Sequence, residues 1–208
     1  MKKVCIIHGY NTDPTRGWIP WLKEELNARG ISAYAPVLPS PAHPSPLEWI
    51  RCIREMIDTQ IHADDELILV GHSLGVAGIL RTLQYETFGS HVPARTLEGL
   101  PPHTLPAPLI GVVLVSGRHG TTDNPRTGAF YTDGFDIEHI KTCGAQFEII
   151  HGDKDPVVNP LEAEAFGQSF HVTPRYVHGG GHLTEVDGYT TLPICLEVIL
   201  KICKRCRT

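Results

Sequence analysis

Short apolar runs recur along this chain, each bounded by glycine, proline or polar residues. A strand that is buried on both faces reads as a continuous apolar run of about four to eight residues, so these runs predict the strands of a parallel sheet. The predicted strands are Val4–Ile7, Ser32–Val37, Glu66–Val70, Ile110–Ser116, Gln146–Ile150 and Arg175–His178.

Between the runs, apolar residues recur three or four positions apart, which is the spacing of one helix face. Alternating strands and helices favour the α/β class, and we expect a three-layer α/β/α sandwich with about six mainly parallel strands. Right-handed crossovers would gather the functional loops at the carboxyl ends of the strands. The helical spacing is carried by Trp18, Trp21, Leu22 and Leu26, by Trp49, Ile50, Ile53, Ile57 and Ile61, and by Leu192, Leu196, Ile199, Leu200 and Cys203.

Three weakly patterned stretches, Pro39–Pro46, Phe88–Pro108 and Arg118–Asp136, are rich in proline, glycine, threonine and histidine and are predicted to be surface loops. None of them has the composition of a linker between domains. A chain of 208 residues with 41% hydrophobic content can bury one substantial core, but two domains of that total length would be small. We therefore expect a single domain over residues 1–208.

Composition and charge narrow the class of protein. A formal net charge of −5 leaves no basic face for a nucleic-acid backbone. The first apolar run is too short for a signal peptide or a membrane span. The six cysteines are scattered, and several fall on predicted core faces, where a free thiol behaves as a small hydrophobe. We expect a cytoplasmic protein with no nucleic-acid partner and no membrane span.

The most informative motif is Gly71-His72-Ser73-Leu74-Gly75, which follows the run Leu67–Val70 and leads into a helix-compatible segment. In a nucleophile elbow, serine occupies a strained turn between a strand and a helix. Neighbouring side chains would collide there unless glycine stood two positions before and two positions after the serine. Ser73 is therefore the predicted nucleophile.

A serine nucleophile needs a general base and a carboxylate that orients the base, in the chain order serine, acid, histidine. The loop after the fifth predicted strand carries two aspartates, Asp153 and Asp155. Asp155 is the preferred acid, because the following proline favours an extended backbone and Gly152 suits a turn that aims the carboxylate across the strand ends. Asp153 is the alternative.

The base is expected on the next loop, His178-Gly179-Gly180-Gly181-His182. His182 fits best, because three glycines allow the loop to bring an imidazole over the sheet, and His178 is expected to be structural. The histidines without an assigned partner are expected to be exposed; they are His43, His62, His91, His103, His119 and His171.

Two patterns could suggest a metal site, the pair His178 and His182 and the sequence Cys203-Lys204-Arg205-Cys206. Glycine breaks the helix that would align the two histidines, and the cysteine pair has no second pair of ligands nearby. We predict neither a metal nor a cofactor.

An oxyanion hole would complete the site with two backbone N–H groups. One is expected from Leu74, directly after the nucleophile, and the second from Tyr10, because Gly9 permits close backbone approach in the turn after the first strand. Asn11 is the alternative second donor. Ser116 and the segment Arg118–Tyr131 follow the next strand and are expected to border the site.

With these motifs in this order, the chain resembles the α/β-hydrolase superfamily, and within it the small retinoblastoma-binding-protein-9 type of serine hydrolase. The resemblance spans nearly the whole chain and implies a minimal hydrolase core without a large cap. It maps Ser73, Asp155 and His182 onto the family's catalytic triad. The matching stretches are Gly17–Leu26, Gly71–Ser73, Val115–Ser116, Asp133–Lys141, Asp155–Pro156 and Gly181–His182.

The expected function is hydrolysis of a small carboxylic ester, thioester or amide through an acyl-enzyme. An alternative is a protein-binding module with marginal catalysis, since a fold does not specify a function. A partner motif of the Leu-x-Cys-x-Glu type would support that alternative, but the stretch Pro193–Glu197 has proline where leucine belongs and is predicted to lie in the last helix. Other chemistry on the same triad, such as perhydrolysis or C–C bond cleavage, stays open.

Overall fold

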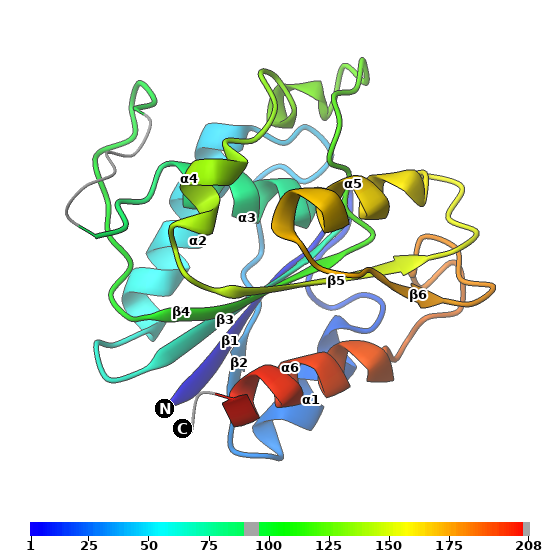
Figure 1. Ribbon diagram of the computed structural model, residues 1–208, viewed down its shortest axis with the longest axis horizontal. Coiled ribbons are helices and arrows are strands. Elements are labelled where there is room, and N and C mark those ends of the chain that lie inside the picture. Colours follow the sequence, from blue (N-terminus) through cyan, green and yellow to red (C-terminus); the bar gives the residue numbers. More distant parts are fainter. Residues whose placement is uncertain (90–95, 206–208) are drawn as a thin grey trace.

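The computed structural model describes residues 1–89 and 96–205 and places them around one parallel sheet (Figure 1). The strands lie in the order β2-β1-β3-β4-β5-β6, so the chain starts one strand in from an edge, adds β2 at that edge and then builds the other four strands outward on the opposite side. All five pairings are parallel. The strands are β1 (Lys2–Ile7), β2 (Ser32–Tyr34), β3 (Glu66–His72), β4 (Leu109–Val115), β5 (Gln146–Gly152) and β6 (Arg175–Val177).

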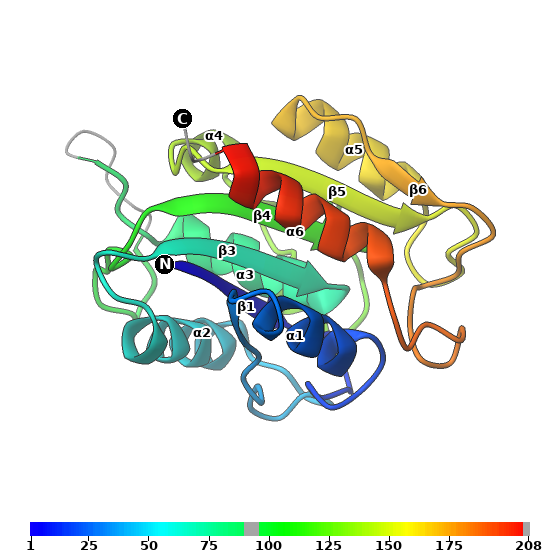
Figure 2. The ribbon, with the colours of Figure 1, turned by 90° about the horizontal axis from the view of Figure 1, so that it is seen from below.

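Helices cover both faces of the sheet, as Figures 1 and 2 show. On one face lie α1 (Ile19–Asn27) and α6 (Pro193–Arg205), which contact each other. The other face carries α2 (Pro46–Gln60), α3 (Leu74–Gln84), α4 (Ile137–Lys141) and α5 (Leu161–Phe170), with the short 3₁₀ helix η1 (Gly128–Phe130) beside them. The predicted three-layer sandwich of the α/β class is confirmed.

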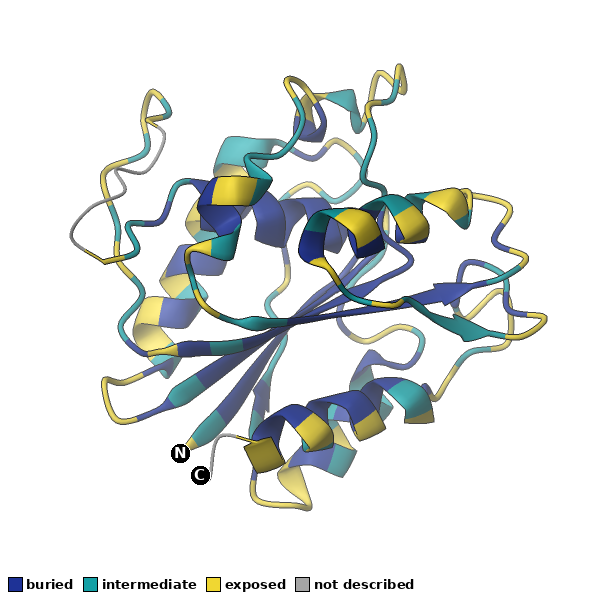
Figure 3. Ribbon diagram, in the orientation of Figure 1, coloured by how far each residue is buried: buried dark blue, intermediate teal, exposed yellow. Residues whose placement is uncertain are grey.

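The core consists of two apolar layers, one on each face of the sheet, and the strands β1, β3, β4 and β5 between them are almost wholly buried (Figure 3). Successive side chains of a strand point to opposite faces. In β1, Cys5 and Ile7 pack under α2 and α3, whereas Val4 and Ile6 pack under α1 and α6. Burial on both faces explains why the strands read as unbroken apolar runs.

The second strand is the predicted strand whose bounds differ most from the structure. The second strand ends at Tyr34 rather than Val37, because Pro36 has no N–H to donate to the sheet. Helix α5 was not predicted, since its buried face includes the small residues Ala163 and Gly167, which weaken the apolar pattern. Part of the predicted loop Phe88–Pro108, with His91, and Cys206 of the cysteine pair lie outside the described residues.

The expectation that unassigned histidines are exposed is wrong for two of them. His103 is largely buried between two carboxylates, and half-buried His119 contacts the Ser169 hydroxyl at 2.9 Å. His43, His62 and His171 are exposed as expected. Within residues 1–89 and 96–205, no helix is long and apolar enough to cross a membrane.

Candidate active site

The turn between β3 and α3 has the backbone strain expected of a nucleophile elbow. Ser73 adopts φ 54° and ψ −121°, a conformation that costs free energy for a residue with a side chain. The flanking glycines are required by space: a Cβ atom at Gly75 would lie 2.2 Å from the Ile7 carbonyl oxygen, and one at Gly71 would lie 2.8 Å from the Val76 Cα. The motif thus places Ser73 at the carboxyl edge of the sheet.

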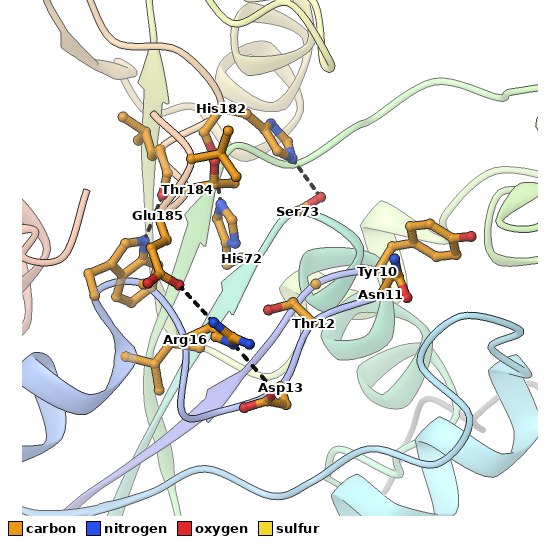
Figure 4. A pocket seen from close by; sticks show the side chains of 16 residues that line it. Tyr10, Asn11, Thr12, Asp13, Arg16, His72, Ser73, His182, Thr184 and Glu185 are labelled. Atoms are coloured by element: carbon orange, nitrogen blue, oxygen red, sulfur yellow. Dashed lines mark hydrogen bonds and ion pairs between the residues drawn. The ribbon is translucent and has the colours of Figure 1, made fainter. Parts of the chain in front are cut away.

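The structure brings Ser73, His182 and Asp155 into one hydrogen-bonded chain. His182 Nε2 lies 2.8 Å from Ser73 Oγ, and His182 Nδ1 lies 2.7 Å from Asp155 Oδ2. Figure 4 shows the imidazole of His182 directed at the serine hydroxyl. The three groups come from the ends of β3 and β5 and from the loop after β6, which are far apart in the sequence.

Asp155 is held by more than the histidine. Its Oδ1 accepts hydrogen bonds from the amides of Val157 at 2.8 Å and Val158 at 2.9 Å. Burial by itself would raise the pKa of Asp155, but the hydrogen bond from His182 and those from the two amides together hold that pKa below its ordinary value. The carboxylate is therefore ionised near neutral pH and oriented toward His182.

The alternative acid, Asp153, has other partners. Its carboxylate contacts His178 Nδ1 at 3.1 Å and accepts the amide of Gly179 at 2.7 Å. These contacts fasten the start of the glycine loop, in keeping with a structural role for His178. The loop also passes close to β5, because a Cβ atom at Gly152 would lie 2.0 Å from the Gly181 carbonyl oxygen.

Two buried side chains hold the backbone on which His182 stands, and sequence reasoning missed both. Trp18 Nε1 donates to the Leu183 carbonyl at 3.0 Å, and His72 Nε2 lies 2.9 Å from the His182 carbonyl. A carbonyl only accepts, so His72 carries its proton on Nε2. Burial, with a smaller contribution from nearby His182, lowers the pKa of His72 to about 4 and keeps it neutral. In the sequence, the one signal for a role of His72 in holding the histidine loop is its position next to Ser73.

The turn after β1 lies against Ser73. A Cβ atom at Gly9 would lie 3.0 Å from Ser73 Cβ, a tight contact that favours glycine there. The amide of Asn11 donates to the Pro41 carbonyl at 2.8 Å and is therefore engaged in holding the loop Pro39–Pro46. That contact favours Tyr10 over Asn11 as an oxyanion donor.

A cavity of about 430 Å³ opens beside Ser73 and His182. In it Arg16 faces two carboxylates, with Arg16 Nε 4.0 Å from Asp13 and Nη1 3.7 Å from Glu185 (Figure 4). The lining residues come from three segments; they are Gly9–Asp13 with Arg16–Ile19, His72–Ser73, and His182–Val186.

Ser116 and the segment Arg118–Tyr131, expected to border the site, are not among the residues that line this cavity. One contact from that segment to the site is the hydrogen bond from Arg126 Nη1 to the Tyr10 hydroxyl at 3.0 Å. Among the described residues, no group of three or more His, Cys, Asp and Glu side chains is arranged to hold a metal ion.

Comparisons with solved structures agree with this architecture. The crystal structure of the ydeN gene product of Bacillus subtilis matches with a TM-score of 0.80 and 30% identity, covering 98% of this chain and 100% of that chain. A meta-cleavage product hydrolase from Pseudomonas fluorescens matches with a TM-score of 0.70 over all of this chain and 92% of its own, at 14% identity. At that identity the likeness shows the α/β-hydrolase fold alone.

The sequence comparisons go further. The chain is 30% identical over 199 residues to Putative hydrolase YdeN of Bacillus subtilis (strain 168), covering 95% of this chain and 94% of YdeN. The narrower likeness to the retinoblastoma-binding-protein-9 type stays a prediction. The family model of the serine hydrolases matches residues 4–201, and the chain therefore belongs to the serine hydrolase family.

Proposed function

We propose that this protein hydrolyses a small carboxylic ester through a Ser-His-Asp triad and an acyl-enzyme intermediate. The observation that carries the proposal is the unbroken series of hydrogen bonds from Asp155 through His182 to Ser73. A serine hydroxyl is a poor nucleophile at neutral pH, and a histidine at 2.8 Å can accept its proton as the hydroxyl attacks.

In the proposed first step, Ser73 Oγ attacks the ester carbonyl while its proton moves to His182 Nε2. His182 then gives that proton to the departing alcohol, which leaves the acyl group on Ser73. In the second step, water loses a proton to His182 and attacks the acyl carbonyl, and Ser73 recovers its proton as the acid departs. Asp155 holds the Nδ1–H tautomer of His182 and stabilises the imidazolium formed in each step.

The amides of Leu74 and Tyr10 are the proposed donors to the oxyanion. Leu74 is the first residue of α3, where a helix has N–H groups without intrahelical acceptors and a favourable dipole for negative charge. Losing one donor of this kind typically costs a hundredfold or more in rate.

A small ester fits the size of the cavity, and the class of substrate is also suggested by neighbours of low identity. Est1E from Butyrivibrio proteoclasticus, whose structure has been solved with ferulic acid bound, matches with a TM-score of 0.64 at 15% identity. The meta-cleavage product hydrolase shares the fold as well, so hydrolysis of another bond by the same triad is the nearest rival. The protein-binding alternative has less support, since Cys195 of the stretch Pro193–Glu197 is fully buried in α6.

The test is labelling with a fluorophosphonate, followed by intact mass, and hydrolysis of p-nitrophenyl acetate. We expect one adduct per chain on Ser73, no adduct in folded Ser73→Ala, and ester hydrolysis by the wild type only. Ser40→Ala is a matched control, since Ser40 also has a positive φ but lies outside the cavity lining. A folded wild type that neither reacts nor hydrolyses the ester would overturn the proposal and favour the binding module.

A further inference from the structure

His8 lies at the end of β1, fully buried beneath the proposed oxyanion turn. Both of its ring nitrogens have backbone partners. Nδ1 lies 2.9 Å from the Gly9 carbonyl oxygen, and Nε2 lies 3.1 Å from the amide nitrogen of Leu38. Trp49 packs against the ring edge-on, with 5.9 Å between ring centroids.

These partners determine the tautomer of His8. The Gly9 carbonyl can only accept a hydrogen bond, so Nδ1 must carry the proton, and the Leu38 amide can only donate, so Nε2 must be bare. Burial lowers the pKa of His8 and so favours the neutral ring. A neutral His8 thus donates its single N–H to the carbonyl of Gly9.

The carbonyl of Gly9 and the amide of Tyr10 belong to one peptide group. Among the described residues no peptide bond is cis, so the two groups point in opposite directions, and fixing the carbonyl also fixes the N–H. Gly9 lies in contact distance of Ser73, so a reversal of this peptide would present an oxygen instead of an N–H near the nucleophile. On the other side of Tyr10, the Asn11 amide is tied to Pro41.

We propose that His8 is a positioning residue for catalysis: it holds the Gly9–Tyr10 peptide with the Tyr10 N–H available to the oxyanion. The inference rests on the proposed hydrolase function. Glycine at position 9 is favoured by the close approach to Ser73, yet glycine is also the residue least able to fix its own backbone. The hydrogen bond from His8 supplies the missing constraint, and the Leu38 amide sets the orientation of the ring.

Two substitutions separate the two hydrogen bonds of His8. In His8→Asn the side-chain amide reaches the place of Nδ1 and can still donate to the Gly9 carbonyl, whereas the contact to Leu38 is lost. In His8→Gln the longer amide reaches the place of Nε2 and can accept from Leu38, whereas the contact to Gly9 is lost. His139→Asn is the matched control, because His139 is also buried but contacts the Glu86 carbonyl, far from the site.

The measurement is kcat and KM for p-nitrophenyl acetate, on variants whose folding is checked by circular dichroism and thermal melting. We expect kcat to fall about a hundredfold in His8→Gln with little change in KM, and to stay within about threefold of wild type in His8→Asn and His139→Asn. Wild-type kcat in folded His8→Gln, or an equal loss in both His8 variants, would overturn the inference.

A second measurement needs no variant. Nitrogen-15 NMR of histidine-labelled wild-type protein near neutral pH should show His8 as the Nδ1–H tautomer, and an Nε2–H tautomer would overturn the inference. A wild type that is folded but unreactive toward both fluorophosphonate and ester would instead contradict the proposed hydrolase function. The two failures are therefore distinguishable.

Discussion

Two histidines at opposite ends of the sheet each lie between two partners, yet they suit different tasks. His182, at the carboxyl edge, contacts the Asp155 carboxylate and the Ser73 hydroxyl. His103, in the segment before β4, contacts Glu86 through Nδ1 at 2.5 Å and Asp58 through Nε2 at 2.9 Å. The two arrangements have similar geometry, but the second partner of His182 is a hydroxyl and that of His103 is another carboxylate.

A histidine between two carboxylates satisfies both only when both nitrogens carry protons. The hydrogen bond to Glu86 is the main reason that the pKa of His103 is raised, which favours the protonated ring. Arg54 adds a second cation on Glu86, which is fully buried. This cluster fastens the segment around His103 to α2 and α3.

His182 has a hydroxyl where His103 has a second carboxylate. The hydroxyl can donate its proton, so Nε2 of His182 can be bare and accept. A hydroxyl partner that can donate a proton therefore lets His182 accept one, whereas two carboxylate partners, which only accept, favour the protonated ring of His103.

The largest expected effect is loss of the base itself. His182→Ala should lower kcat for p-nitrophenyl acetate by about 10⁴- to 10⁶-fold, because it removes the group that lies 2.8 Å from Ser73 Oγ and takes its proton in the proposed mechanism. His103→Ala, matched to it, should keep wild-type kcat while melting at a lower temperature. Steady-state kinetics and thermal melting of both folded variants test this difference. Equal losses of kcat would contradict a catalytic role for His182 and a structural role for His103.

The next effect concerns the acid. Asp155→Asn should lower kcat by about 10³- to 10⁴-fold, since an amide can no longer hold the tautomer of His182 that leaves Nε2 bare. Asp58→Asn changes the exposed carboxylate beside His103 and should leave kcat unaltered. Kinetics across pH 6 to 9 check both variants, and a mild loss in Asp155→Asn would contradict the role assigned to Asp155.

A smaller effect is expected from the support of the histidine loop. Trp18→Phe removes the indole N–H that binds the Leu183 carbonyl while keeping most of the buried ring. A loosened loop displaces His182, and kcat should fall about tenfold with a smaller change in KM. Trp21→Phe, in the first turn of α1 directly after Trp18 but without that contact, is the control. A loss of equal size in both variants would indicate general destabilisation of α1.

The smallest effect is on stability and depends on pH. The pKa of His103 is raised in the folded state, so its protonation stabilises the fold fully below the unfolded pKa of 6.5, and that contribution is lost as pH rises through the folded pKa. Wild type should therefore melt a few degrees above His103→Gln at pH 5.5, and the gap should narrow by pH 9. A gap that widens with rising pH would contradict a charged His103.

Much of the fold could be predicted because local pattern and tertiary environment agree. The strands are buried on both faces, so their apolar runs were plain, and the glycines around Ser73 reflect a steric need that is local to the turn. Helix α5 is hard to predict because its buried face mixes the small residues Ala163 and Gly167 with two phenylalanines. The burial of His103 is hard to predict because its carboxylate partners, Asp58 and Glu86, lie 45 and 17 residues away.

The pattern of residues along the chain was enough to predict the order of the strands and of most helices, the elbow at Ser73 and the short set of acids and histidines able to serve it. The fold was needed to show that Asp155 rather than Asp153 faces His182, that Trp18 and His72 hold the histidine loop, and that Arg16 and not Ser116 is among the residues lining the cavity. The reason is physical: strain and burial within one turn depend on neighbours in sequence, whereas a hydrogen bond between loops depends on where the sheet brings their ends together.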